Sequence, residues 1–197
     1  MITKSELLQC AIAKFTKFGS KQVTLDELAQ ELRISKKTIY SFFKNKEDLV
    51  VTSIETLLNE YKEDINRIVS VNDNDSVLSV IFIYKRGFEY LKYFKPSFIY
   101  GLEKYYPKAY KLFNSFSEDL AQNTICNLLK KAQKQGDLIP ELDIDLLVKI
   151  YFSRVDNLLF KSNNLFEMYS KETLLKHMVI YNLQGVVSKS YTNSFFE

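Results

Sequence analysis

The chain has 197 residues, of which 46% are hydrophobic and 26% are charged, as in ordinary globular proteins. Five glycines and three prolines supply few turn formers, so long helices with short connections are expected rather than a many-stranded sheet. Two cysteines, Cys10 and Cys126, are too few for a disulfide framework or a cysteine metal site, and neither metal nor cofactor is predicted.

The net charge of +3 is confined to the first 50 residues, which contain nine Lys/Arg and six Asp/Glu. The remaining residues contain eighteen of each sign. Residues 35–46 carry four lysines and no acid, a local pattern that suits a polyanion. A patch this small binds with modest affinity unless it is duplicated.

No apolar run approaches the roughly 18 residues of a membrane span, so no membrane association is predicted. Lys4, Glu6 and Lys14 interrupt the N-terminal segment, which therefore does not resemble a secretory signal peptide. A cytoplasmic location is expected.

Residues 4–18 are predicted to form the first helix, because their apolar residues recur at three- and four-residue spacing before Gly19. Two short helices follow. Thr24 and Glu27 form a capping-box pattern at the start of one, and Ser35 can cap the other. Asn45 can cap a third, with acids in its first turn. Two capped helices this close together are typical of a helix-turn-helix.

This region resembles the tetracycline-repressor (TetR) family of bacterial transcription regulators. The matching residues are Thr24, Leu28-Ala29, Ile34-Ser35-Lys36, Thr38-Ile39-Tyr40, Phe43 and Lys46-Glu47-Asp48-Leu49. The sequence departs from the family pattern at Arg33 and Lys37, which replace frequent glycines, and at Phe42, which replaces a frequent tyrosine. These departures indicate that this protein prefers a DNA sequence different from those of its relatives.

The resemblance implies a double-stranded DNA operator as partner, read by the second helix of the motif in the major groove. Lys36 and Lys37 are expected to reach guanines or phosphates, and Thr38 and Ser41 to face base edges. Thr24, Tyr40 and Lys46 are the expected phosphate contacts. The full set of predicted DNA-binding residues is Thr24, Ser35, Lys36, Lys37, Thr38, Tyr40, Ser41, Phe42 and Lys46.

The rest of the chain also reads as helical. A long helix is expected from Lys46 to about Val71, before a polar break at 72–75. Further helices are expected over residues 76–94, 96–105, 107–135, 143–161 and 170–190, with a frayed tail from Tyr191. The predicted fold is all-α with about nine helices: a three-helix DNA-binding domain over residues 1–47 and a helical effector-binding and dimerisation domain over 48–197.

Residues 82–116 hold 13 of the 28 phenylalanines and tyrosines. One interpretation is a bulky core with surface tyrosines. The other is a cavity for a small apolar or aromatic effector, as TetR-family bodies commonly contain. The predicted ligand-binding residues are Tyr84, Phe88, Phe98, Tyr105, Phe113 and Phe152.

The last two predicted helices carry apolar stripes wide enough to face both a core and a second subunit. In the family the two C-terminal helices form a dimer interface, which implies a homodimer on a near-palindromic operator. The predicted interface residues are Tyr151, Val155, Leu158, Leu159, Leu175, Met178 and Val179.

These patterns predict a sequence-specific transcription regulator, a repressor that an effector releases from its operator. The alternative is a DNA-binding structural protein of the same fold without an effector. An enzyme is not predicted, because His177 is the sole histidine and the sequence has no P-loop, dinucleotide-binding or HExxH motif.

Overall fold

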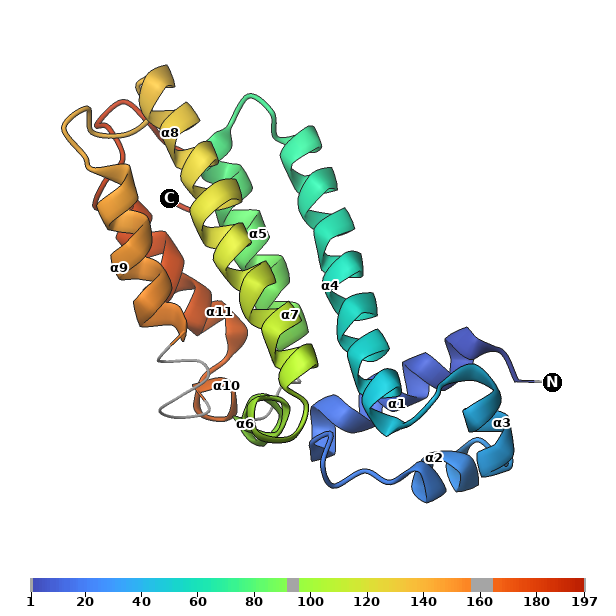
Figure 1. Cartoon of the computed structure of the whole chain (residues 1–197). Coiled ribbons are helices and arrows are strands. Elements are labelled where there is room, and N and C mark those ends of the chain that lie inside the picture. Colours follow the sequence, from blue (N-terminus) through green and yellow to red (C-terminus); the bar gives the residue numbers. More distant parts are fainter. Residues whose placement is uncertain (1, 92–95, 157–164, 197) are drawn as a thin grey trace. The chain divides into compact units, whose positions relative to one another are not determined.

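A computed structural model describes residues 2–91, 96–156 and 165–196 of the chain. Within these ranges the chain is helical and has no strand, apart from one isolated antiparallel bridge between Leu138 and Val187. The helices are α1 (Lys4–Phe18), α2 (Leu25–Glu31), α3 (Lys36–Phe42), α4 (Lys46–Val71), α5 (Ser76–Leu91), α6 (Pro96–Tyr105), α7 (Pro107–Asp119), α8 (Cys126–Gln135), α9 (Ile144–Asp156), α10 (Leu165–Met168), α11 (Lys171–Leu175) and α12 (Tyr181–Gln184) (Figure 1). Two π-helical segments, η1 (Leu120–Ile125) and η3 (Lys176–Ile180), connect α7 to α8 and α11 to α12.

The predicted all-α fold is confirmed for the described residues. The helix expected over residues 107–135 corresponds to α7, η1 and α8, which follow one another without a break. The final helix ends at Gln184, earlier than the predicted residue 190, and α10 was not predicted. The expected ends at residues 94 and 161 lie outside the described residues.

The chain divides into two compact units, residues 1–60 with 93–115, and residues 61–92 with 116–197. Helices α4 and α7 each begin in the first unit and continue into the second. The predicted boundary after residue 47 separates functions, whereas these two units are defined by packing. That boundary therefore stays a prediction.

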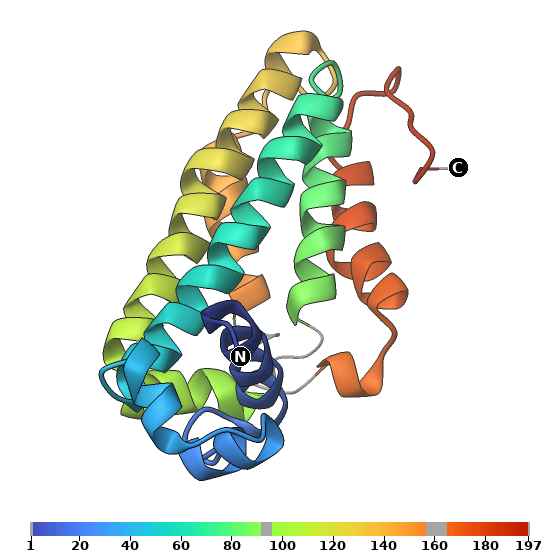
Figure 2. The same ribbon diagram turned by 90° about the vertical axis from the view of Figure 1, so that its right-hand side faces the viewer.

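In the first unit α1 packs against α2 and α6, and α2 packs against α3 (Figure 2). The side chains buried in this unit come from all of these helices and from the start of α4. They include Leu7, Phe15, Leu28, Ile39, Leu49, Phe98 and Leu102.

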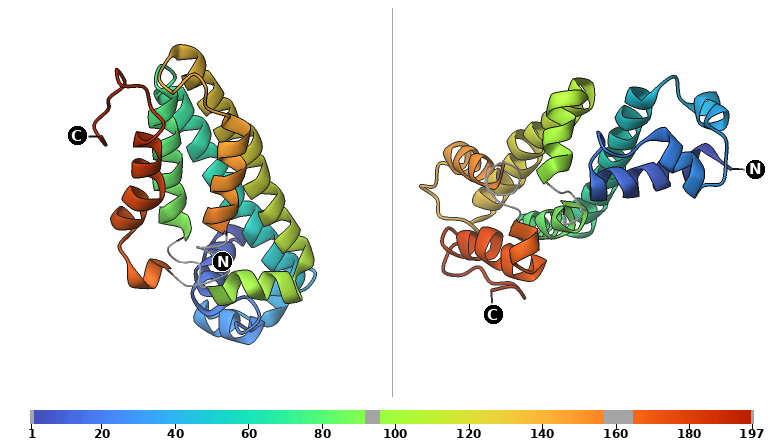
Figure 3. Two further views of the ribbon diagram at one scale, coloured as in Figure 1. Left: turned by 90° about the vertical axis from the view of Figure 1, so that its left-hand side faces the viewer. Right: turned by 90° about the horizontal axis from the view of Figure 1, so that it is seen from below.

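In the second unit α5 packs against α8 and α11, and α9 packs against α8 and η1 (Figure 3). Its core joins apolar residues from these helices and from η3, among them Val77, Ile81 and Val179. The segment after α12 was expected to fray. Instead, Phe195 and Phe196 pack against the core, and the Tyr191 hydroxyl donates a 2.7 Å hydrogen bond to Asp75.

Local sequence signals account for most helix ends. Ser170 accepts a hydrogen bond from the Thr173 amide at 3.1 Å, as a cap of α11 should, and Gly136 ends α8 at a φ of 86°. Helix α5 begins at Ser76. The cap is Asp75, which accepts from the Leu78 amide at 2.8 Å.

Candidate nucleic-acid interface

The α2–turn–α3 motif has capped ends. The Glu27 amide donates to the Thr24 hydroxyl at 3.1 Å and the Thr24 amide to the Glu27 carboxylate at 2.8 Å, which confirms the predicted capping box. The Thr38 amide donates to the Ser35 hydroxyl at 3.2 Å at the start of α3. The Asp48 amide donates to the Asn45 side chain at 2.8 Å at the start of α4. These caps fix where each helix begins.

One face of α3 is buried and the other is exposed. Ile39, together with Phe43 just after the helix, lies in the core of the first unit with 1% and 2% of its surface exposed. Lys36, Lys37 and Ser41 are exposed, and Tyr40 is 52% exposed. Because the apolar residues face the core, the predicted DNA-binding residues of α3 face away from it. Among them, Thr38 and Phe42 are half-buried and the others are exposed.

Some of these side chains already have intramolecular partners. Lys36 pairs with Asp26 of α2 at 2.7 Å, and this bond raises the pKa of the lysine. The Ser41 hydroxyl donates to the Thr38 carbonyl at 2.7 Å, and the Ser35 and Thr38 hydroxyls lie 3.0 Å apart. The sequence analysis did not predict that Asp26, an acid in the first turn of α2, pairs with Lys36.

Lys46 lies at the start of α4, partly buried against the turn between α1 and α2. Its ammonium donates to the Lys21 carbonyl at 3.2 Å and lies 5.9 Å from the ring centroid of Tyr106. Burial, together with the nearby Lys21 ammonium, lowers the pKa of Lys46. Lys21 and Tyr106 were not predicted at this site, because nothing in the local sequence places residues 60 positions apart in contact.

The predicted ligand-binding residues are distributed over both units. Phe98, Tyr105 and Phe113 belong to the first unit, where Phe98 and Phe113 are buried and Tyr105 is 42% exposed. Phe88 is buried in the second unit, and Phe152 packs against the core there. Tyr84 lines a pocket of about 30 Å³ in the second unit together with Val80, Leu129 and Tyr151.

A larger recess of about 570 Å³ lies in the second unit between α4 and the α7–η1 region. Its lining is mixed: Lys62, Ile65, Asn66, Val69, Ser70, Asp73, Phe116, Asp119, Leu120 and Thr124. The recess thus takes Phe116 from the aromatic segment, and its other lining residues are aliphatic, polar or charged.

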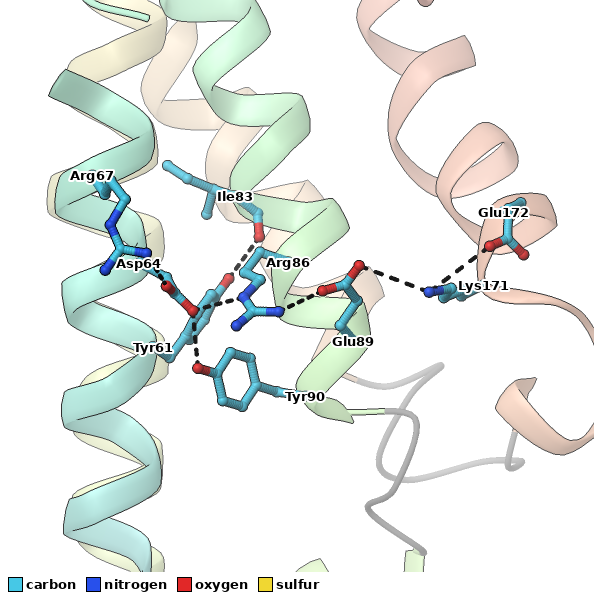
Figure 4. A network of polar contacts seen from close by, with 9 residues as sticks. All are labelled: Tyr61, Asp64, Arg67, Ile83, Arg86, Glu89, Tyr90, Lys171 and Glu172. Carbon is cyan, nitrogen blue, oxygen red and sulfur yellow. Dashed lines mark hydrogen bonds and ion pairs between the residues drawn. The ribbon is translucent and has the colours of Figure 1, made fainter. Parts of the chain in front are cut away.

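A polar network connects three helices of the second unit (Figure 4). The Arg86 guanidinium of α5 donates to Asp64 of α4 and to Glu89, both at 2.6 Å. The Tyr90 hydroxyl donates to Asp64 at 2.9 Å, and Lys171 of α11 lies 3.7 Å from Glu89. Burial acts to raise the pKa of Asp64, but the bonds from Arg86 and Tyr90 outweigh it and hold that pKa below its usual value.

The predicted dimer interface stays a prediction, but several of the side chains that it names lie inside the core of the second unit. Leu175, Met178 and Val179 are at least 93% buried within the core of their own unit, so they offer little surface to another subunit. Tyr151 is half-buried and lines the small pocket. Leu158, Leu159 and the side chain of Val155 lie outside the described part of the chain.

The apolar side chains exposed on these helices are different ones. Leu146 and Ile150, one turn apart on α9, are 53% and 60% exposed, and Tyr181 of α12 is 52% exposed. The periodicity of the sequence predicted an apolar stripe on these helices. It does not show which side of that stripe faces the core.

Within the described ranges, no helix is long and apolar enough to cross a membrane. The same ranges contain no cluster of three or more His, Cys, Asp or Glu able to hold a metal ion.

Residues 7–52, which include the α2–turn–α3 motif, match the family model of bacterial regulatory proteins of the tetR family. The HTH-type transcriptional regulator YhgD of Bacillus subtilis (strain 168) is 26% identical over 189 residues, covering 93% of this chain and 96% of its own. The biofilm operon icaADBC negative transcriptional regulator IcaR of Staphylococcus aureus is 26% identical over 120 residues, covering 61% of this chain and 58% of its own.

The fold is shared with solved structures. The ketosteroid transcriptional regulator KstR2 of Mycobacterium tuberculosis superposes with a TM-score of 0.69 at 15% identity, covering 96% of this chain and 98% of its own.

A capped helix-turn-helix with an exposed face on α3, in a chain similar to HTH-type regulators, defines the class, a helix-turn-helix transcriptional regulator. Residues 7–52 are the helix-turn-helix domain of the tetR family of bacterial regulatory proteins, and along most of its length the chain is similar to an HTH-type regulator. Its relatives are regulators, the class that the sequence predicted in preference to an enzyme.

Proposed function

We propose that this regulator is a homodimeric, cytoplasmic repressor that binds a near-palindromic operator and is released by a small effector. The observation that carries the DNA-binding part is the exposed face of α3, where Lys37, Tyr40 and Ser41 point away from a core closed by Ile39 and Phe43. TetR-family regulators bind operator DNA and act as dimers. Repression is supported by the relative IcaR, which is named a negative regulator.

The positions of the side chains support one proposed DNA contact for each of them. Lys37 and Ser41 of α3 would read base edges, whereas Thr24, Tyr40 and Lys46 would hold phosphates and set the register. Lys36 would exchange Asp26 for DNA, and Ser35 and Thr38 would keep α3 capped while presenting their outer atoms. Phe42 would contribute ring contact alone, since it has no hydroxyl.

Binding of purified protein to fragmented genomic DNA tests the proposal. The fragments recovered should share an inverted repeat whose half-sites are about one helical turn apart, since two-fold related recognition helices have that spacing. Uniform recovery of all fragments would instead favour the structural protein without sequence preference.

Two lysine variants separate base reading from phosphate binding. Lys37→Ala should change which bases are preferred in the half-site, at a cost of about 1–3 kcal/mol for the wild-type operator. Lys46→Ala should weaken binding to all sequences alike and reduce the salt slope by about 1. Competition binding with single-base operator variants at several salt concentrations measures both. An unchanged salt slope in Lys46→Ala would remove this residue from the phosphate contacts.

The effector part of the proposal is placed in the second unit. The pocket beside Tyr84, at about 30 Å³, is far smaller than the roughly 300 Å³ of a typical small ligand site. The recess beside α4, at about 570 Å³, is large enough. We propose that an effector there acts on α4, the helix that directly follows the helix-turn-helix along the chain.

A thermal-shift screen tests this placement. A compound that stabilises the wild-type protein should release it from operator DNA, and Val69→Trp should abolish both effects by filling the recess. A hit unaffected by Val69→Trp binds elsewhere, for example among the predicted aromatic residues.

A further inference from the structure

The surface beside the helix-turn-helix carries exposed aromatic rings under lysine ammonium groups. Phe18 at the end of α1 is 47% exposed, and Tyr100 and Tyr105 of α6 are 57% and 42% exposed. Lys17 lies 5.1 Å from the Phe18 centroid, Lys21 lies 4.6 Å from that of Tyr105, and Lys104 lies 5.5 Å from those of Tyr100 and Tyr105. We call these six residues, Lys17, Phe18, Lys21, Tyr100, Lys104 and Tyr105, the basic–aromatic patch.

The patch is assembled by the packing of α6 on the end of α1 (Figures 1 and 3). The Tyr106 hydroxyl donates to the Ser20 carbonyl at 3.4 Å. A Cβ at Gly101 would lie 3.5 Å from the Ser20 hydroxyl, at ordinary van der Waals distance, so α6 and the turn after α1 lie in direct contact. These contacts place the turn after α1, with Lys21, beside Tyr105.

The patch continues into the proposed DNA-binding face. The Lys21 carbonyl accepts the hydrogen bond from Lys46, and Thr24 caps α2 three residues further on. Lys46 and Thr24 are two of the proposed phosphate contacts. A DNA backbone held by them therefore lies next to Lys21.

The charge of this surface selects the partner. Neighbouring lysines are already paired with carboxylates, Lys14 with Glu31 and Lys108 with Glu47. Lys17, Lys21 and Lys104 lie over aromatic rings, as Lys14 also does at 5.5 Å from the Phe18 centroid, and Lys104 also donates to the Tyr100 hydroxyl at 3.3 Å. Glu103 is the exposed acid next to Lys104 in the sequence. The three ammonium groups and the two tyrosine hydroxyls can donate hydrogen bonds to phosphate oxygens.

We propose that the basic–aromatic patch is an accessory DNA surface, on which Lys17, Lys21 and Lys104 bind backbone phosphates outside the bases read by α3. This proposal rests on the proposed DNA binding by the helix-turn-helix. The basic–aromatic patch adds DNA affinity that is independent of base sequence, because phosphate contacts carry no base information.

The test compares two double variants of the full chain. Lys21→Gln/Lys104→Gln removes two charges from the patch, and Lys134→Gln/Lys189→Gln removes two from exposed positions of the second unit. Operator binding is measured from low to high salt, together with binding to a scrambled duplex of equal length. Thermal melts confirm that both variants fold.

In the patch variant the slope of log affinity against log salt should fall by about 1.8 per chain, since each phosphate contact contributes about 0.9. Affinities for operator and scrambled DNA should fall by the same factor, so that their ratio is unchanged. Lys21→Arg/Lys104→Arg should restore the slope, and the control variant should keep it.

A wild-type slope in the patch variant would overturn the proposal and leave the surface to an acidic protein partner. An equal loss in the control variant would overturn it too, because the effect would then be one of net charge. Failure of the wild-type chain to bind any DNA would overturn the proposed function itself, which separates the two failures.

Discussion

Arg33 occupies the turn between α2 and α3 with a φ of 54°. It is the one non-glycine residue with positive φ in the described part of the chain, and the family pattern favours glycine there. A side chain in this region of backbone space costs about 1–2 kcal/mol, because its Cβ crowds the neighbouring carbonyl oxygen. The turn keeps its shape all the same, since the Ile34 amide donates to the Ala29 carbonyl at 2.9 Å.

Replacing this residue should therefore stabilise the protein. Arg33→Gly is expected to raise the free energy of unfolding by about 0.5 kcal/mol, the relief of strain less the entropy that glycine adds to the unfolded chain. Arg33→Ala retains the Cβ and should give no gain. Urea unfolding of the three proteins measures the difference, and equal stabilisation by both variants would show that the side chain, not the backbone, is the source of strain.

At the level of elements, α4 and α5 approach closely within the second unit. Gly87 of α5 faces Tyr61 of α4, and a Cβ at Gly87 would lie 2.6 Å from the tyrosine hydroxyl. That hydroxyl donates to the Ile83 carbonyl at 2.8 Å, so the ring is held in place. The glycine is required by packing at this point.

Gly87→Ala should accordingly destabilise the protein by about 1–3 kcal/mol, the usual cost of overpacking. Tyr61→Phe removes the clashing oxygen, so the double variant should lose less than the sum of the two single losses. A double-mutant cycle by thermal or urea unfolding measures the coupling. Additive losses would mean that α4 and α5 separate to accept the extra carbon.

The polar network between α4, α5 and α11 has a predictable dependence on pH. Bonds from Arg86 lower the pKa of Glu89, and bonds from Arg86 and Tyr90 lower that of Asp64 despite its burial. The unfolded chain therefore binds more protons near pH 3–4, where such carboxyls ordinarily titrate. The stabilisation is present above that range and is lost as the pH falls through the lower folded values.

Asp64→Asn/Glu89→Gln should therefore be less stable than the wild type at pH 7 and should lose less further stability on acidification. Chemical unfolding at a series of pH values between 7 and 2.5 measures the two curves. Asp119→Asn serves as the control. Asp119 directly precedes η1, and its carboxylate is exposed. Parallel curves for the network variant and the wild type would contradict the assignment.

For the whole molecule, the helix-turn-helix patch is small and a second copy is needed for tight binding. The exposed Leu146 and Ile150 of α9 and Tyr181 of α12 are the surface that we propose for the second subunit, in place of the buried residues first predicted. Covering these side chains would remove large apolar groups from water.

Ile150→Glu should then produce a monomer in which the α2–turn–α3 motif remains folded. Operator affinity should fall by about 100-fold or more, because the two half-sites are no longer bound together. Sedimentation equilibrium and operator titration measure the two effects. Val71→Glu, at a side chain 77% exposed near the end of α4, is the matched control and should remain dimeric.

The sequence by itself determined the helical class, the helix-turn-helix and most helix ends. The signals for these features lie within a few residues of one another: Thr24 with Glu27, Ser35 with Thr38, and Gly136 after α8. Capping and turn geometry depend on neighbours along the chain, so a linear pattern is sufficient to predict them.

Only the tertiary structure decided which side of each apolar stripe faces the core and which distant residues meet. Met178 and Val179 are buried while Ile150 is exposed, although all three are apolar residues of predicted helices. Lys21 meets Tyr105 across 84 positions because α6 packs on α1. Such contacts depend on how helices pack in three dimensions, and that packing also produces the surface that we assign to the DNA backbone.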